Sequence, residues 1–301
     1  MHAAAAPFSP SHRACDALYH VQLHLYHANV GSVTYELAII GGGNMGSALL
    51  AGLLGGGGPT DAAEIVVIEP SAARREALAA EFPKVAVEAE PVSCRSALIA
   101  VKPQYVGEVV GQVVAAGARR ILSIAAGVTT EAIAAAAGGA DSAGASVSVV
   151  RAMPNTPALV GEGVSALAGA PGTPPADLDW AEQVLSGVGL VVRVAEYQLD
   201  AVTGLTGSGP AYVFLVAEAL IDAGVLAGLP RALVEQMVTR LLVGSSALLA
   251  ERGDPAQLRA MVTSPGGTTA AGLRALEQHA VRAAFLDAVQ ASAARSLELG
   301  A

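Results

Sequence analysis

A glycine-rich loop between a strand and a helix restricts the folds open to this chain more than any other feature. Residues 36–40 (ELAII) are mostly apolar, as in a buried strand. The sequence GGGNMG follows at once at residues 41–46, ahead of a predicted helix over residues 47–54. In a dinucleotide fingerprint Gly41 permits the tight turn, Gly43 lets a pyrophosphate approach the backbone, and Gly46 lets helix and strand pack closely. The loop therefore predicts a Rossmann-type domain that binds NAD(H) or NADP(H).

Short apolar stretches alternate with helical ones as far as residue 196. Strands that are apolar throughout are typical of parallel sheets covered by helices on both faces. We therefore predict an α/β fold with a parallel, doubly wound sheet over residues 35–196. Its further strands are expected at residues 65–68, 97–101, 121–124, 147–150, 164–168 and 190–194, with helices at 72–81 and 177–185.

After residue 196 the pattern becomes helical only. Helices are predicted at residues 210–227, 230–252, 256–261, 270–279 and 282–299, with Gly or Pro at most boundaries. Hydrophobic residues make up 53% of the chain and charged residues only 14%, which favours an extensive subunit interface. We therefore predict a second, all-α domain over residues 197–301.

Residues 1–34 precede the first predicted strand and contain five of the six histidines. His20, His24 and His27 have helical spacing and could be metal ligands. An α/β domain needs nothing before its first strand, however, so we expect a poorly ordered extension and no metal site.

Composition also bears on partners and compartment. The net charge is −9 and the 17 basic residues are spread thinly, which argues against nucleic acid as a partner. No uninterrupted apolar run reaches the roughly 18 residues of a membrane span, so no membrane contact is expected. Cys15 and Cys94 form neither a disulfide framework nor a zinc spacing, and a cytoplasmic location fits.

The residues after the second predicted strand bear on the choice of cofactor. An acid at the position of Glu69 usually bonds the adenosine ribose hydroxyls and disfavours a 2′-phosphate. Ser71, Arg74 and Arg75 follow at once and could hold that phosphate, although the arginines could equally form a solvated helix face. The sequence leaves NADPH and NADH both open.

Several later strands end in loops that should line the nicotinamide half of the cofactor. In an open α/β sheet the ligand lies across the carboxyl ends of the strands. The loops begin at Lys102-Pro103, Ala126-Gly127 and Met153-Pro154-Asn155. Lys102 could be a plain surface charge, but it is one of two lysines and it ends a buried strand, which favours a contact.

A turn about 220 residues after the glycine loop has a different character. In TSPGGTT at residues 263–269, Gly266 and Gly267 permit a sharp bend, and two threonines then begin a helix. Backbone N–H groups and the helix dipole at such a point favour a small carboxylate. A plain helix–helix turn with a threonine cap is the alternative.

Taken together, the motifs resemble those of pyrroline-5-carboxylate reductases. The resemblance covers about residues 36–299 and is carried, in the family's order and spacing, by GGGNMG (41–46), AVKPQ (100–104), SIAAGV (123–128), RAMPNTPALV (151–160), DAVTGLTGSGPAY (200–212) and SPGGTT (264–269). It implies reduction of 1-pyrroline-5-carboxylate to L-proline with NADPH or NADH, the last step of proline biosynthesis. It also implies a helical dimerisation domain that interlocks with its partner, an active site shared between two subunits, and, in many members, decamers.

The local patterns and the resemblance together give a set of candidate site residues. Thr269 is the candidate catalytic residue, as a hydrogen-bond donor or proton relay to the substrate nitrogen. Substrate binding is assigned to Glu196, Ser264, Gly266, Gly267, Thr268 and Thr269. Cofactor binding is assigned to Gly41, Gly43, Asn44, Met45, Gly46, Glu69, Ser71, Ala100, Val101, Lys102, Pro103, Ala125, Ala126, Gly127 and Asn155.

The chain also departs from its relatives just before the turn. Many of them have Leu-Lys-Asp where this chain has LRA at residues 258–260, and some have a cofactor-contacting Asn where it has Met261. An Asn that is usual ahead of the Val-Lys-Pro strand is not evident either. These changes concern cofactor contacts more than the reaction.

Three other functions are compatible with parts of the sequence. A β-hydroxyacid dehydrogenase needs a proton-transfer group, usually a Lys in the helical domain, yet no lysine follows Lys102 and His279 is the only histidine beyond residue 34. A deazaflavin-dependent NADP reductase resembles the nucleotide domain alone. A non-catalytic nucleotide-binding scaffold would not need both the cofactor loop and the turn at residues 263–269.

Overall fold

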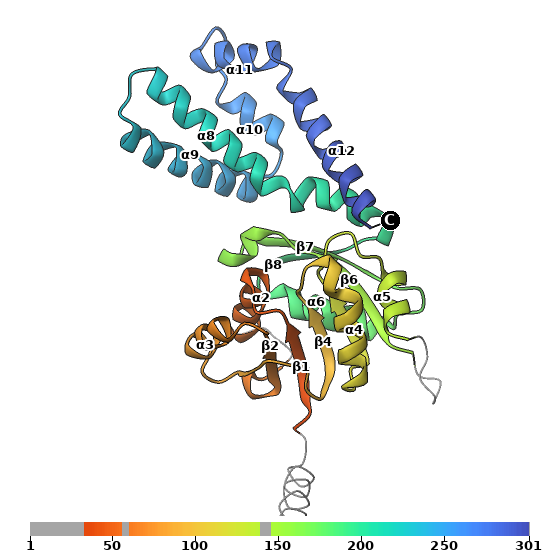
Figure 1. Cartoon of the computed structure of the whole chain (residues 1–301). Coiled ribbons are helices and arrows are strands. Elements are labelled where there is room, and N and C mark those ends of the chain that lie inside the picture. The colour runs from red at the N-terminus through yellow and green to blue at the C-terminus, as the bar shows by residue number, and fades with distance from the viewer. Residues whose placement is uncertain (1–32, 56–59, 139–145, 301) are drawn as a thin grey trace, which may run out of the picture. The chain divides into compact units, whose positions relative to one another are not determined.

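An eight-stranded sheet forms the first part of the protein (Figure 1). The computed structural model describes residues 33–55, 60–138 and 146–300. In the sheet the order is β3-β2-β1-β4-β5-β6-β7-β8. The strands are β1 (Tyr35–Ile40), β2 (Ile65–Ile68), β3 (Ala86–Glu88), β4 (Cys94–Ile99), β5 (Arg120–Ser123), β6 (Ser148–Met153), β7 (Gly163–Gly169) and β8 (Gly189–Arg193). The extension predicted for residues 1–34 lies almost wholly outside the described residues.

The direction of the last two strands differs from the prediction. All neighbours from β3 to β6 are parallel, but β7 is antiparallel to β6, and β8 is parallel to β7. The expectation of an entirely parallel sheet was therefore wrong for β7 and β8. The connection from β6 to β7 holds only the short helix η3 (Thr156–Val160), and a parallel crossover needs a dozen or more residues.

Helices cover both faces of the sheet, as predicted. Alternate residues of β1 point to opposite faces, so Leu37 and Ile39 join one hydrophobic cluster while Ala38 and Ile40 join the other. Helices α2 (Asn44–Leu54), α3 (Ala72–Glu81) and α6 (Pro175–Ser186) pack in the first cluster. Helices α4 (Val106–Ala115) and α5 (Thr130–Ala136) pack in the second. Short helices η1 (Ala62–Glu64) and η2 (Pro103–Tyr105) lie in the connections.

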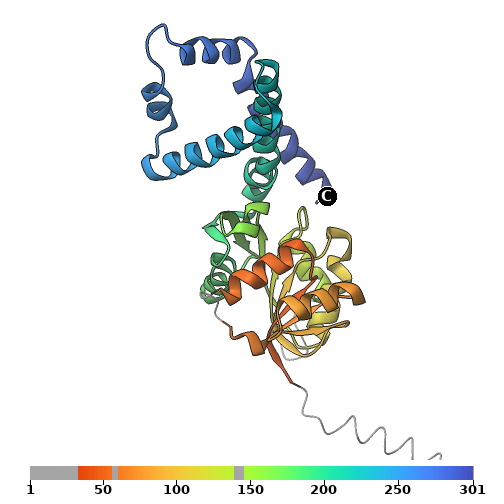
Figure 2. The ribbon, with the colours of Figure 1, turned by 90° about the vertical axis from the view of Figure 1, so that its left-hand side faces the viewer.

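Residues 196–300 are helical throughout, which confirms the prediction of a change near residue 196. They form η4 (Glu196–Gln198), α7 (Leu199–Val202), the π-helical turn η5 (Thr203–Gly207), α8 (Gly209–Leu226), α9 (Arg231–Arg252), α10 (Pro255–Met261), α11 (Thr268–Gln278) and α12 (Val281–Leu299). Figure 2 shows α9, α10 and α11 following one another around an open frame. Because residues 35–301 cluster as one compact unit, a domain boundary at residue 196 stays a prediction.

The helical residues bury little of their own apolar surface. In residues 196–300, all of which are described, only Leu199, Val234 and Val238 are buried hydrophobics, whereas Phe214 and Leu215 of α8 are 63% and 65% exposed. The helical stretches Glu196–Leu226 and Arg231–Arg252 are long and apolar enough to cross a membrane by length and composition alone. The expectation concerned uninterrupted apolar runs, whereas these helices reach the length because they continue through the glycines and polar residues that interrupt such runs.

Candidate active site

The glycine loop has the geometry that a dinucleotide pyrophosphate needs. Gly41 has a φ of +103°, and a Cβ on it would lie 2.6 Å from the Ala100 carbonyl oxygen. A Cβ on Gly46 would overlap the Gly41 carbonyl oxygen, so helix and strand approach closely there. Nothing lies within 4 Å of a Cβ on Gly43, the residue before α2. The loop is therefore tight where the protein packs against itself and open where a phosphate would approach.

The partly buried Glu69 carboxylate, just after β2, binds two backbone N–H groups. Its Oε2 accepts from the Gly42 N–H at 3.0 Å, and its Oε1 accepts from the Ser71 N–H at 2.9 Å. The Arg74 guanidinium donates to the Gly42 carbonyl oxygen and to the Ser47 hydroxyl, both at 2.6 Å. Arg75 donates to the carbonyl oxygens of Glu69 and Pro70 at 2.9 and 2.8 Å. The sequence left open whether Arg74 and Arg75 bind a phosphate or form a solvated helix face. Neither alternative describes these contacts, because both side chains donate hydrogen bonds to backbone carbonyl oxygens.

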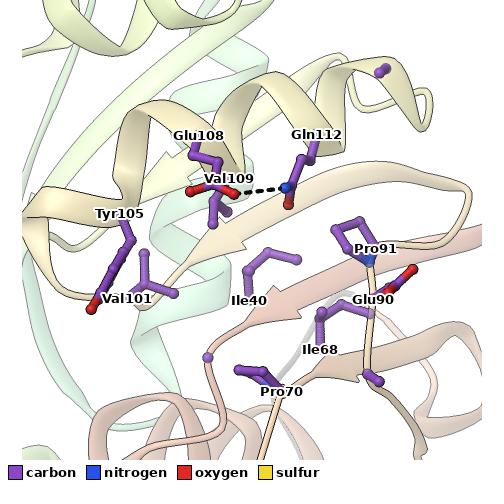
Figure 3. A pocket seen from close by; sticks show the side chains of 13 residues that line it. Ile40, Ile68, Pro70, Glu90, Pro91, Val101, Tyr105, Glu108, Val109 and Gln112 are labelled. Atoms are coloured by element: carbon purple, nitrogen blue, oxygen red, sulfur yellow. Dashed lines mark hydrogen bonds between the residues drawn. The ribbon is translucent and has the colours of Figure 1, made fainter.

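A cavity of about 760 Å³ adjoins this loop at the carboxyl ends of β1, β2 and β4 (Figure 3). Ile40, Ile68, Pro70, Val101 and Tyr105 give it apolar walls. Apolar walls next to the strand end that carries Glu69 suit an adenine ring. The sequence prediction included Val101 and missed Pro70 and Tyr105, although both follow strand ends, which was the available signal.

The residues predicted to face the nicotinamide also collect at this edge of the sheet. Because β1, β4 and β5 are parallel neighbours, Gly41, Val101 and Ala125 lie after adjacent strands. Lys102 and Pro103 are exposed, whereas Ala125 and Gly127 are buried. A Cβ on Gly127, which has a φ of +79°, would lie 3.2 Å from the Leu299 carbonyl carbon, so the end of α12 packs on this loop.

Asn155, after β6, is held by protein on both sides of its amide. Its Nδ2 donates to the Thr206 carbonyl oxygen at 3.0 Å, and its Oδ1 accepts from the Val164 N–H at 2.8 Å. In a continuous α-helix the Thr206 carbonyl would accept from residue 210, but Pro210 has no N–H. The side chain, 8% exposed, thus ties the loop after β6 to the π-helical turn.

A buried ion cluster centred on Arg151 connects sheet and helices. The Arg151 guanidinium, in a residue 4% exposed, lies 3.6 Å from Glu196 Oε1 and 3.5 Å from Asp200 Oδ1. Glu196 also accepts from the N–H and the hydroxyl of Thr130, both at 2.6 Å, and caps α5. Asp200 accepts from the Ser296 hydroxyl of α12 at 2.7 Å. Glu196, predicted to bind substrate, therefore has several protein partners, and no local pattern in the sequence indicates this pairing.

The turn at residues 264–269 has the predicted shape. Gly266 has a φ of +67°, the Gly267 N–H donates to the Ser264 carbonyl oxygen at 3.0 Å, and α11 begins at Thr268. No side chain caps this helix, so its first N–H groups lack a side-chain acceptor. The Thr269 hydroxyl has no hydrogen-bond partner among the described residues. A plain capped turn would have used one of the threonines as its cap.

Within one chain, the turn and the glycine loop are not joined. No hydrogen bond or ion pair of the described residues links residues 263–269 to residues 35–193. Among the residues described, no group of three or more His, Cys, Asp or Glu side chains could hold a metal ion. Burial raises the pKa of the Cys94 thiol, in β4, to about 11, which leaves it unreactive.

A Rossmann-type sheet with a glycine loop and a carboxylate just after its second strand is typical of an NAD(P)H-dependent oxidoreductase. Residues 196–299 match the family described as pyrroline-5-carboxylate reductase dimerisation, and residues 36–127 match NADP oxidoreductase, coenzyme F420-dependent. The pyrroline-5-carboxylate reductase of Synechocystis is 44% identical over 278 residues, which cover 89% of this chain and 99% of that protein. The chain belongs to the pyrroline-5-carboxylate reductase family.

Solved structures agree with this assignment and confirm the predicted fold class. A pyrroline-5-carboxylate reductase from Coxiella burnetii matches with a TM-score of 0.80 and 31% identity, covering 89% of this chain and 100% of that one. A Plasmodium falciparum pyrroline carboxylate reductase with NADP bound gives 0.75 and 28%, covering 90% and 100%. The match to the coenzyme F420-dependent family ends at residue 127, which agrees with a likeness to the nucleotide domain alone.

Proposed function

We propose that the protein reduces 1-pyrroline-5-carboxylate to L-proline, the last step of proline biosynthesis, in the cytoplasm. The observation that carries this proposal is the uncapped turn at residues 264–269, in a chain whose cofactor loop is intact. The turn offers N–H groups and hydroxyls to a small anion, as a cyclic imine carboxylate requires. Cys94 as a buried free thiol suits a reducing compartment.

The chemistry requires little of the protein beyond binding and orientation. The nicotinamide supplies a hydride to the imine carbon, and the ring nitrogen ends with one proton more than in the neutral imine. The N–H groups at residues 266–269 hold the substrate carboxylate. The Thr269 hydroxyl hydrogen-bonds the ring nitrogen, donating to it in the neutral imine and accepting from its N–H in the protonated imine. A threonine hydroxyl is a weak acid, so Thr269 orients the ring or relays a proton, and the protonated imine is already a good hydride acceptor.

The cofactor contacts follow the loops at the sheet edge. Gly41, Gly43, Asn44, Met45 and Gly46 hold the pyrophosphate, and Glu69 and Ser71 face the adenosine ribose. Ala100, Val101, Lys102, Pro103, Ala125, Ala126 and Gly127 lie toward the nicotinamide. Asn155 and Glu196 act through their protein partners, as positioning residues for the loop after β6 and the start of α5.

The active site is completed by a second subunit. In one chain no bond joins the turn to the cofactor loop, and many large apolar side chains of α8 and α9 are exposed, whereas these helices lie in the segment that matches a dimerisation family. We therefore infer an interlocked homodimer in which the turn of one subunit faces the cofactor loop of the other. Assembly of such dimers into decamers extends the same proposal, and neither nucleic acid nor a membrane has a part in it.

Replacement of Thr269 tests the substrate site. Thr269→Ala should lower kcat/KM for pyrroline-5-carboxylate about ten- to thousand-fold, the range for a lost donor or general acid, because the ring nitrogen loses its partner. The matched control is Thr263→Ala, in the same turn, whose hydroxyl donates to the Arg259 carbonyl oxygen at 2.6 Å. Stopped-flow oxidation of NADH or NADPH gives both values, and equal kinetics in the two variants would remove Thr269 from the mechanism.

Substrate range tests the reaction class. NAD(P)H oxidation is expected with pyrroline-5-carboxylate, and none with a β-keto acid or an oxidised deazaflavin. Turnover of either of the latter at a higher kcat/KM would overturn the proposal in favour of the dehydrogenase or the deazaflavin reductase. Nucleotide binding without any turnover would favour a scaffold.

A further inference from the structure

Glu69 occupies the position at which a 2′-phosphate on the cofactor would have to bind. NADPH differs from NADH only by this phosphate on the adenosine ribose, which lies beside the residue that ends the second strand of a Rossmann domain. Here the Glu69 carboxylate already accepts from the N–H groups of Gly42 and Ser71. Paired backbone N–H groups of this kind are what an anion-binding loop offers to a phosphate.

The remaining capacity of Glu69 suits ribose hydroxyls. A carboxylate has about four lone-pair sites, and two of them are used by Gly42 and Ser71. The other two can accept hydrogen bonds from hydroxyl groups, which are donors, whereas a phosphate offers only acceptors and a like charge. The carboxylate is therefore compatible with a free 2′-hydroxyl and repels a 2′-phosphate.

The nearby arginines do not offset this repulsion. Arg74 spans from the Gly42 carbonyl to the Ser47 hydroxyl, and Arg75 holds the carbonyl oxygens of Glu69 and Pro70. Movement toward a phosphate would leave these backbone acceptors without their donors. The adenine cavity adds two further carboxylates, Glu90 and Glu108, to its lining (Figure 3).

We propose that Glu69 is the specificity-determining residue of the cofactor site and that the protein prefers NADH to NADPH. The inference rests on the proposed function in that NADH is taken to be the hydride donor of that reaction. The binding experiment that tests it does not depend on the reaction. It separates the chain from the Plasmodium relative, whose structure has NADP bound. Removal of the carboxylate would leave the Gly42 and Ser71 N–H groups free to donate to a 2′-phosphate.

The first experiment compares binding of nucleotide fragments. Isothermal titration calorimetry with ADP and with adenosine 2′,5′-bisphosphate, and with NAD⁺ and NADP⁺, needs no substrate. Wild type should bind NAD⁺ about tenfold or more tighter than NADP⁺. Glu69→Ala should raise affinity for NADP⁺ and the 2′,5′-bisphosphate relative to NAD⁺ and ADP by a further ten- to hundred-fold, roughly the worth of one or two charge-assisted bonds.

Matched variants separate the role of Glu69 from net charge and from folding. Glu81→Gln removes an exposed carboxylate at the end of α3, outside the cavity lining, and should leave the NAD⁺ to NADP⁺ ratio unchanged. Glu69→Gln preserves the side-chain volume and should shift the ratio in the same direction as Glu69→Ala, by a smaller factor.

The outcomes distinguish this inference from the proposed function. A wild type that binds NADP⁺ as tightly as NAD⁺, or a ratio that Glu69→Ala leaves unchanged, overturns the inference even if the enzyme reduces pyrroline-5-carboxylate rapidly. Conversely, the predicted ratios in a protein without turnover would support the inference and overturn the proposed function. Steady-state kcat/KM for NADH and NADPH should follow the binding ratios.

Discussion

The sheet of residues 35–193 and the helices of residues 196–300 complete their cores in different ways. Every central strand of the sheet is covered on both faces, and its two hydrophobic clusters are buried within one chain. In the helical region, by contrast, no residue of α8 is buried. The hydrophobic core of the sheet region is therefore complete within one chain. The helical region exposes apolar side chains that a second subunit would have to bury.

The largest effect is expected from a charge on the exposed face of α8. Phe214→Glu should abolish dimerisation and lower kcat/KM more than about hundredfold, because the charge would be buried without a partner when the subunits meet. Sedimentation velocity and activity assays measure the two effects. Hydrogen exchange should show a loosened helical region and an intact sheet.

The control for that variant lies in the sheet. Leu190→Glu replaces another exposed hydrophobic residue, on the edge strand β8, and should change neither assembly nor activity. A Phe214→Glu protein that remains dimeric and active would contradict the interpretation that a second subunit buries the apolar side chains of α8. So would a wild type that sediments with lipid vesicles, since the long apolar helices would then belong in a bilayer.

A smaller effect is expected where the two regions join. Arg151→Met leaves the Glu196 and Asp200 carboxylates without their cation and should lower the free energy of unfolding by about 2–4 kcal/mol, somewhat less than for a fully buried pair. Urea denaturation measures the loss, and amide exchange should accelerate in α7 and α12 before it does in β1 and β4. If α7 and α12 kept wild-type exchange rates, the cluster would not hold the helices to the sheet.

The matched control for Arg151 is an exposed ion cluster of similar composition. Arg193 of β8 pairs with Asp179 and Glu182 of α6, and all three side chains are well exposed. Arg193→Gln should leave the melting temperature unchanged, because solvent screens such pairs. The contrast between the two arginines measures what burial adds to an ion pair in this protein.

The smallest expected effect concerns Cys94, a buried residue in the core of the sheet region. Burial raises the pKa of Cys94 to about 11, above its value in the unfolded chain, so the stability associated with the neutral thiol is present below about pH 9. As pH rises toward 11, about 2–3 kcal/mol of it should be lost relative to Cys94→Ala. Parallel stability curves for the two proteins between pH 8 and pH 11 would show that the thiol does not titrate as expected.

Much of the sheet could be predicted because its strands are continuous apolar runs bounded by Gly and Pro. The strand Ile65–Ile68 and the helix Ala72–Glu81 match their predicted ends. β3 was missed because Ala86–Glu88 has three residues and no distinctive pattern. The reversed direction of β7 was also missed, although the short connection before it carried that information.

The site was predictable where one segment supplies the geometry and unpredictable where distant segments meet. The glycine loop and the turn at residues 264–269 depend on local backbone freedom, which the sequence displays. The bond from Asn155 to Thr206 and the Arg151 cluster join residues about 50 positions apart, and no periodicity encodes such pairs. For the same reason the arginines after Glu69 could not be assigned until their backbone partners were known.

The helical region buries few apolar side chains within one chain, and this has a consequence for the kinetics of folding. The sheet can complete its folding in a single chain, at a rate independent of concentration. If α8 and α9 gain their core only from a second copy, the last step of folding is a bimolecular encounter, and its rate rises with the amount of protein. Newly made chains at low concentration would then accumulate with a finished nucleotide site and no working enzyme, until a partner arrives.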